Sequence, residues 1–98
     1  MTTHYGVKFR DDAAREWKEL GATIQKQFAK KLKALIDNPH IPSARLSGIQ
    51  NCYKIKLKAS GYRLVYEVVD NQLIIIVITV GKRNGNELYD IAKKRVEF

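Results

Sequence analysis

The stretch Tyr53-Lys-Ile-Lys-Leu-Lys58, followed by Tyr62-Arg-Leu-Val-Tyr-Glu-Val-Val69, decides the fold. The first run alternates strictly between apolar residues and lysines, which is the pattern of a strand with one buried face. Ala59-Ser-Gly61 between the two runs is typical of a turn, so we predict an antiparallel hairpin. The next run, Leu73 to Val80, is β-branched nearly throughout and predicts a strand that is covered on both faces.

Burial selects the register of this hairpin. In antiparallel pairing the numbers of opposed residues sum to a constant, and an even constant would place lysines among the apolar side chains. We therefore predict an odd constant. Five apolar residues then share the buried face: Ile55, Leu57, Tyr62, Leu64 and Tyr66. Four positively charged residues share the opposite face, which we call the cationic face: Lys54, Lys56, Lys58 and Arg63.

The cationic face has two interpretations. Only Glu67 offsets its charge, and opposed like charges destabilise a sheet by about 0.2–1 kcal/mol per pair. We therefore expect these clustered cations to bind an anion. Alternatively, the lysines protect an edge strand against aggregation. We favour the anion-binding interpretation, because Arg63 extends the charge onto a second strand.

The segment before the hairpin predicts a short strand and two helices. Tyr5-Gly-Val-Lys-Phe9 alternates between apolar and polar residues, as a strand does. Asp11 and Asp12 are candidates to cap a helix that runs from about Asp12 to Leu20. A second helix is expected from about Thr23 to Asp37, because apolar residues recur at helical spacing until Asn38-Pro39.

The C-terminal segment completes the predicted fold. After the loop Gly81-Lys-Arg-Asn-Gly85 we expect a last helix, with Leu88, Ile91 and Ala92 turned inward. The element order is then β-α-α-β-β-β-α. This order predicts an α+β fold, in which a mostly antiparallel sheet carries an N-terminal helical hairpin and a C-terminal helix. A chain of 98 residues suits one core, so a single domain is expected over residues 1–98.

Charge is the unusual feature of the composition. Eighteen Lys and Arg against ten Asp and Glu give a net charge of +8, which favours a polyanionic partner, nucleic acid before an anionic membrane surface. The longest apolar run, Leu73 to Val80, is too short to span a bilayer, and we expect no membrane role. The single cysteine, Cys52, favours a reducing cytoplasm and is interpreted as a small, partly buried residue that begins a strand rather than as a nucleophile.

The available chemistry is that of cations and tyrosines. His4 and His40 are far apart and no phosphate-binding loop occurs, so neither a metal nor another cofactor is expected. RNA carries its own nucleophile, the 2′-hydroxyl, so clustered Lys and Arg could stabilise the phosphorane that forms during its cleavage. Tyr89, close in sequence to Arg83, is the candidate base, since neighbouring cations favour a phenolate. Alternatively, Tyr89 is only a packed helix residue.

Three segments together resemble a known family. They are the run from Cys52 to Tyr66, Val80-Gly-Lys-Arg83, and Glu87-Leu-Tyr89. They closely resemble the RelE family of ribosome-dependent mRNA interferase toxins from bacterial toxin–antitoxin pairs. The similarity continues upstream in Lys18-Glu-Leu-Gly21 and Lys30-Lys-Leu-Lys33, so it covers nearly the whole chain.

The resemblance implies a microbial-ribonuclease-like fold and cleavage of mRNA in the ribosomal A site, which inhibits translation. We expect this cleavage to be metal-independent, because the sequence has no metal-ligand constellation and its side chains supply the cations. The resemblance places catalytic residues at five positions: Lys54, Lys56, Arg63, Arg83 and Tyr89. Three further cations are expected to bind RNA: Arg45, Lys58 and Lys82. The family often has an arginine where this chain has Ser47, and Arg45 does not match that position. This difference is expected to weaken the grip on RNA or ribosome without touching the chemistry.

The resemblance also implies partners. A RelB-like antitoxin, the ribosome and mRNA are expected, with a toxin that is monomeric and oligomerises only through the antitoxin. Two alternatives come from other functional classes. One is a non-catalytic ParE-like toxin of the same fold, which poisons DNA gyrase. The other is an RNA-binding module, although Tyr53, Tyr62 and Tyr66 fall on the buried face and are not available to stack on bases.

Overall fold

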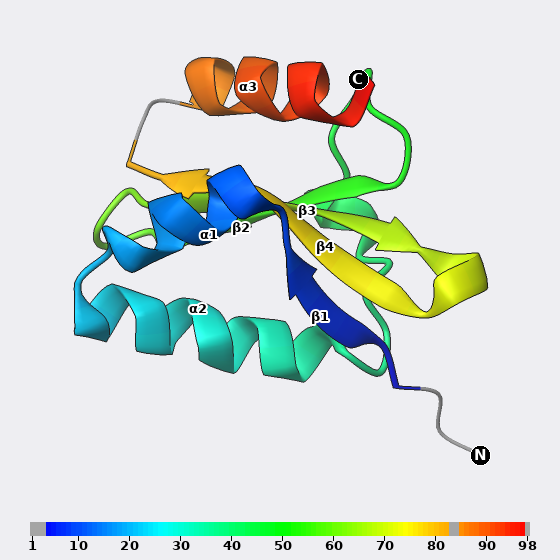
Figure 1. Cartoon of the computed structure of the whole chain (residues 1–98), viewed down its shortest axis with the longest axis horizontal. Coiled ribbons are helices and arrows are strands. Elements are labelled where there is room, and N and C mark those ends of the chain that lie inside the picture. Colours follow the sequence, from blue (N-terminus) through cyan, green and yellow to red (C-terminus); the bar gives the residue numbers. More distant parts are fainter. Residues whose placement is uncertain (1–3, 83–84, 98) are drawn as a thin grey trace.

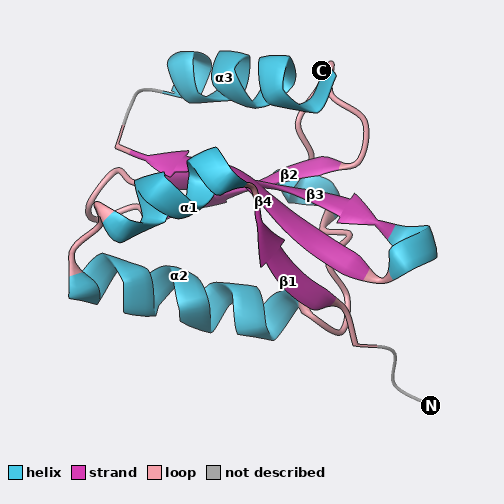
Figure 2. Ribbon diagram, in the orientation of Figure 1, coloured by secondary structure: helices cyan, strands magenta, loops and turns pink. Residues whose placement is uncertain are grey.

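The computed structural model describes residues 4–82 and 85–97. Its centre is a four-stranded sheet in the order β1-β4-β3-β2 (Figure 1 and Figure 2). The strands are β1 (Gly6–Phe9), β2 (Cys52–Lys56), β3 (Arg63–Val69) and β4 (Ile74–Gly81). β1 runs parallel to β4 and the other neighbours are antiparallel, which confirms the predicted α+β fold with a mostly antiparallel sheet.

Helices cover both faces of the sheet. α1 (Asp11–Lys18) and α2 (Ala22–Leu35) pack on one side, and α3 (Gly85–Glu97) lies on the other (Figure 1). The predicted cap of α1 was wrong: Arg10 is the N-cap, and Asp11 and Asp12 lie in the first turn, near the positive end of the helix dipole. Within the described residues, no helix has the length and apolar character needed to cross a bilayer.

The β2–β3 hairpin has the predicted odd register. Tyr53 lies opposite Tyr66, both are buried, and their rings stack with centroids 5.4 Å apart. Leu57, the last apolar residue of the alternating run, is also buried. Lys56 lies opposite Arg63, so these two cations occupy the other face, as the alternation predicted.

Buried side chains form two clusters, one on each face of the sheet. The larger core lies between the sheet and the first two helices and includes Phe28, Leu32, Leu64, Tyr66, Ile75 and Val77. The smaller core lies under α3 and contains Leu46, Ile49, Cys52, Val65, Ile78, Leu88 and Ala92. β4 contributes to both cores, which confirms that this strand is covered on both faces. Cys52 and Val65 share the cationic face, so α3 covers part of that face and leaves the rest to the charged residues.

β1 accompanies only the first half of β4. Its last residue, Phe9, pairs with Val77, and the chain then enters α1. Glu16 of α1 lies at the edge of β4 beyond this point. It accepts hydrogen bonds from the Thr79 hydroxyl (2.9 Å) and the Val80 backbone N–H (3.4 Å). A side chain therefore satisfies the strand edge where the backbone partner has ended.

Candidate functional site

Two neighbouring strands, β2 and β3, place cations side by side at the end of the sheet. Lys56 of β2 pairs with Arg63 of β3, and Arg63 pairs with Gly81 of β4. Lys54 lies two residues back along β2 and therefore on the same face. Arg63 is half-buried and donates a hydrogen bond to the Gly61 carbonyl at 3.4 Å, whereas Lys56 is exposed. The structure thus brings together three of the five predicted catalytic residues.

α3 brings Tyr89 to these cations. Tyr89 is half-buried and packs against the smaller core. The Nζ atom of Lys54 lies 5.9 Å from the centroid of its ring, within the range of a cation–π attraction. We call this the Lys54–Tyr89 contact. It joins β2 to the last helix and places a phenol beside an ammonium group.

The loop after β4 is partly described. Arg83 lies outside the described residues, so its catalytic role stays a prediction. Lys82 is exposed, and its Nζ atom lies 5.6 Å from the ring centroid of Tyr62, a residue that packs against the larger core. Lys82 also lines a cavity together with Glu16 of α1. Its ammonium group therefore turns toward the α1 side of the sheet and does not join the Lys54–Tyr89 contact.

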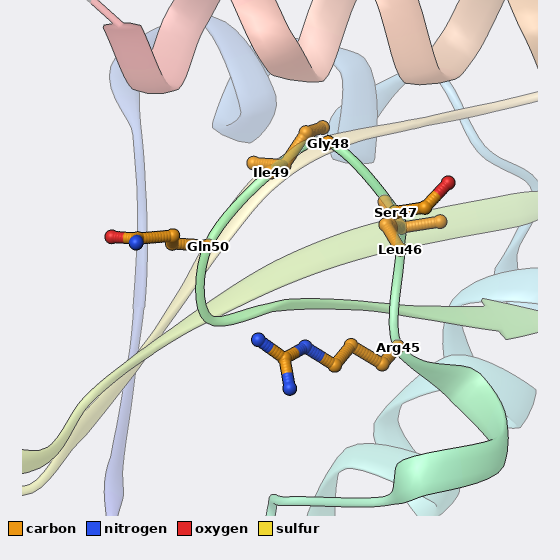
Figure 3. Close-up of a pocket in the computed structure, with 6 residues that line it drawn as sticks. All are labelled: Arg45, Leu46, Ser47, Gly48, Ile49 and Gln50. Carbon is orange, nitrogen blue, oxygen red and sulfur yellow. The ribbon is translucent and has the colours of Figure 1, made fainter.

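Arg45 begins a loop that forms a pocket of ≈ 540 Å³. Six residues line the pocket (Figure 3): Arg45, Leu46, Ser47, Gly48, Ile49 and Gln50. Leu46 and Ile49 are buried and anchor the loop in the smaller core. Figure 3 shows the Arg45 guanidinium and the Ser47 hydroxyl pointing in different directions, so Arg45 presents its charge away from position 47. Lys58, the third predicted RNA contact, is exposed in the β2–β3 turn.

Two other titratable groups belong to the cationic face. Cys52 is fully buried, and desolvation raises the pKa of its thiol to about 12. Cys52 begins β2, as predicted, but it is fully buried rather than partly buried, and its thiol is protonated at neutral pH. Burial also raises the pKa of Glu67, and the positive charge of Arg10 only partly opposes this change. Among the described side chains, no three His, Cys, Asp or Glu residues gather in a group that could hold a metal ion.

An ionic network that the sequence analysis did not anticipate holds α3. Arg95 is mostly buried and donates from two nitrogens to the two carboxylate oxygens of Glu16, at 2.8 and 3.1 Å. Its Nε atom lies 3.1 Å from Oδ2 of Asp12. It also donates to the Ile78 carbonyl at 2.8 Å. We call Arg95 with these three partners the Arg95 clamp.

The Arg95 clamp contacts β4 at an irregularity in the strand. Val65 pairs with Thr79 but Tyr66 pairs with Val77, so Ile78 is the extra residue of a β-bulge. Arg95 binds the carbonyl of this bulged residue. The Glu16 carboxylate raises the pKa of Arg95 and keeps its guanidinium charged. A sequence signal exists: Arg95 follows Leu88 by seven residues and so falls at the edge of the inward stripe of α3, where a cation indicates a partly buried acidic partner.

Comparisons with known proteins define the family. Residues 7–87 match the family described as the ParE toxin of type II toxin–antitoxin system, parDE. A RelE-like toxin protein of Escherichia coli is 62% identical over 92 residues, which cover 94% of this chain and 97% of that protein. The mRNA interferase toxin RelE of Escherichia coli (strain K12) is 46% identical over 92 residues, with the same coverage of 94% and 97%.

Solved structures agree with these sequence matches. A doubly substituted E. coli toxin RelE in the free state is similar with a TM-score of 0.88 at 44% identity, over 95% of this chain and 98% of that one. A chain of the intact E. coli RelBE toxin–antitoxin complex gives a TM-score of 0.79 at 45% identity, over 82% of this chain and 98% of that one.

The chain therefore belongs to the RelE/ParE superfamily of toxins from type II toxin–antitoxin systems. Within this superfamily, 46% identity over nearly the full length places it with the RelE mRNA interferase toxins. The resemblance stated from the strand and loop motifs is confirmed.

Proposed function

We propose that this toxin is a ribosome-dependent endoribonuclease, which cleaves mRNA in the ribosomal A site and so stops translation in the cytoplasm. The observation that carries the proposal is the Lys54–Tyr89 contact beside the Lys56–Arg63 pair. A phenol and three cations converge on one face of the sheet, which suits a reaction that removes a proton and builds negative charge on phosphate. The relative at 46% identity is named an mRNA interferase toxin, which supports the same substrate class.

The converging residues take distinct roles in this mechanism. Tyr89 is the general base on the 2′-hydroxyl, and the ammonium group of Lys54 lies over its ring. Lys54, Lys56 and Arg63 stabilise the phosphorane and orient the RNA backbone, and the planar guanidinium can bind phosphate through two parallel hydrogen bonds. Arg83 is assigned as a further phosphate ligand and the candidate proton donor. Arg45, Lys58 and Lys82 bind the RNA backbone outside the reacting phosphate.

The reaction needs no water in its first step. The base takes the proton of the 2′-hydroxyl, and the resulting oxygen attacks the adjacent phosphorus. The bond to the 5′-oxygen breaks, and that oxygen takes up a proton. The upstream fragment then ends in a 2′,3′-cyclic phosphate, and the downstream fragment begins with a 5′-hydroxyl. Side-chain cations supply the charge stabilisation in every step.

Mapping of mRNA ends in a bacterial translation extract, with and without the toxin, tests this function. New 5′ ends are expected within codons that occupy the A site. Upstream fragments should carry a cyclic phosphate or the 3′-phosphate that forms when it opens. Cleavage should persist at an EDTA concentration that leaves ribosomes intact, with sedimentation as the control for integrity.

Three outcomes would contradict the proposal. A 3′-hydroxyl product, or loss of cleavage in EDTA while ribosomes stay intact, would exclude the metal-independent mechanism. Unchanged messages together with inhibited DNA supercoiling would identify a gyrase inhibitor of the ParE type instead.

We expect an acidic RelB-like antitoxin to silence the toxin. The E. coli RelBE complex joins such a toxin to its antitoxin, and a net charge of +8 attracts an acidic segment. Expression of the toxin alone should stop bacterial growth, and co-expression of the antitoxin gene should restore growth and yield. Size-exclusion chromatography should show a monomer for the toxin alone. High-level expression without a growth defect would contradict this expectation.

A further inference from the structure

The Arg95 clamp lies on the same helix as Tyr89 but outside the catalytic cluster. We propose that Arg95 and Glu16 are positioning residues, which fix the rotation of α3 about its own axis and so hold the Tyr89 phenol beside Lys54. The proposal rests on the role of Tyr89 in the proposed function. Glu16 of α1 and Arg95 of α3 would then support catalysis without contacting the RNA.

Helical geometry separates the clamp from the phenol. Tyr89 and Arg95 are six residues apart, which corresponds to about 9 Å along the helix axis and about 120° around it. Leu88 and Ala92 are buried on the stripe between them. The two side chains therefore leave α3 on opposite flanks of this stripe. Tyr89 reaches β2, whereas Arg95 reaches α1 and β4.

The apolar stripe alone does not fix the rotation of α3. Apolar contacts have no directional preference, and Ala92 offers only a methyl group. A small roll of the helix therefore changes its buried area little but moves the phenol on its flank. Hydrogen bonds to a planar guanidinium are directional, and all three nitrogens of Arg95 are engaged. Arg10 also donates a hydrogen bond to the Arg95 carbonyl at 3.1 Å, which holds the last turn.

The other half of the clamp is itself immobilised. Glu16 accepts from the hydroxyl of Thr79, which is fully buried, and from the backbone of Val80. Both residues belong to β4, and β4 pairs with the strand that carries Arg63. The clamp thus ties the helix that carries the base to the sheet that carries the cations.

A double-mutant cycle on single-turnover cleavage in preassembled ribosome–mRNA complexes tests the proposal. Arg95→Gln is expected to slow cleavage about 10- to 100-fold with unchanged ribosome affinity, because a displacement of about 1 Å can reduce a rate 10²-fold. In the Tyr89→Phe background the same substitution should slow cleavage less than about twofold, because the positioned hydroxyl is already gone. Fully additive losses, or a wild-type rate for Arg95→Gln, would overturn the proposal.

Two further variants complete the design. Glu16→Gln keeps a carbonyl oxygen for Thr79 but removes the charge and one acceptor of Arg95, so it should show the same non-additivity with a smaller loss. Lys94→Gln removes a positive charge from the neighbouring exposed position and should keep the rate within about twofold. Thermal unfolding identifies variants that do not fold at the assay temperature. If Arg95→Gln is unfolded at that temperature, the double-mutant cycle of Glu16→Gln with Tyr89→Phe tests the proposal instead.

A spectroscopic measurement separates this inference from the proposed function. In a toxin with ¹³C-labelled tyrosine rings, the Tyr89 signal is assigned by its loss in Tyr89→Phe. It should shift in Arg95→Gln and stay unchanged in Lys94→Gln. If Tyr89→Phe cleaves RNA at the wild-type rate, Tyr89 is not catalytic. The change in the Tyr89 ring signal in Arg95→Gln still tests whether Arg95 positions this ring. An unmoved Tyr89 signal in Arg95→Gln would refute the clamp itself.

Discussion

Tyr89→Phe is expected to slow single-turnover cleavage of mRNA on preassembled ribosome complexes by at least about 10²-fold, or ~2.7 kcal/mol. The substitution removes only the hydroxyl, so the ring keeps its packing against the smaller core and its place beside Lys54. Arg83→Ala should cause a loss of similar size, because it removes a ligand of the charged phosphorane. Ribosome binding, measured by co-sedimentation, should change little in either variant.

Lys26→Ala and Lys33→Ala are the matched controls. Both lysines are exposed on α2, on the other side of the sheet from Tyr89. Their loss should leave the chemical step unchanged and at most weaken salt-dependent association. Near-wild-type rates in both Tyr89→Phe and Arg83→Ala would overturn the assignment. Equal damage to binding and cleavage in all four variants would favour an RNA-binding module without a catalytic centre.

Leu88→Ala is expected to lower the free energy of unfolding by about 2–5 kcal/mol. Leu88 is 1% exposed and is the large side chain that α3 inserts among Val65 and Ile78 of the smaller core. Those neighbours belong to paired strands and cannot collapse freely into the cavity. Urea unfolding should show a lower midpoint with an unchanged slope. Because a domain of this size is stable by about 5–15 kcal/mol, this is a large share of the total.

Leu73→Ala is the matched control, because it removes the same side-chain atoms as Leu88→Ala but from an exposed position. Leu73 is 44% exposed, so its truncation should change the free energy of unfolding by less than about 0.5 kcal/mol. Similar losses in the two variants would show that burial under α3 does not stabilise the domain.

The sheet could be predicted from the sequence because its signal is local. The alternation between Tyr53 and Lys58 has a period of two, and a slip of one residue would bury lysines, so only odd registers were compatible with burial. The observed pairing of Tyr53 with Tyr66 agrees with this argument. The predicted cap of α1 was wrong because propensity favoured either aspartate as the residue before the helix, whereas Arg10 takes that position and both aspartates lie in the first turn.

The contacts that assemble the site were less predictable because they join distant segments. The alternation placed Lys54 on a face and helical spacing placed Tyr89 on α3, but neither pattern shows where a helix crosses a sheet. Arg95 and Glu16 are 79 residues apart, and Arg95 also binds the carbonyl of Ile78, whose bulge no local sequence pattern predicts. Family resemblance supplied the roles of the five catalytic candidates, whereas the Arg95 clamp emerged only from the structure.

The parallel pairing of β1 with β4 has a consequence for biosynthesis. Gly6 pairs with Ile74, so the first strand to be translated remains without its neighbour until most of the chain has been made. Tyr89 and Arg95 follow later still, in the last helix. Because translation proceeds from the N-terminus, a nascent chain that still lacks α3 has neither the complete smaller core nor the Lys54–Tyr89 contact. On the proposed function, the toxin can therefore cleave mRNA only after α3 has been made, and an antitoxin must be present by then.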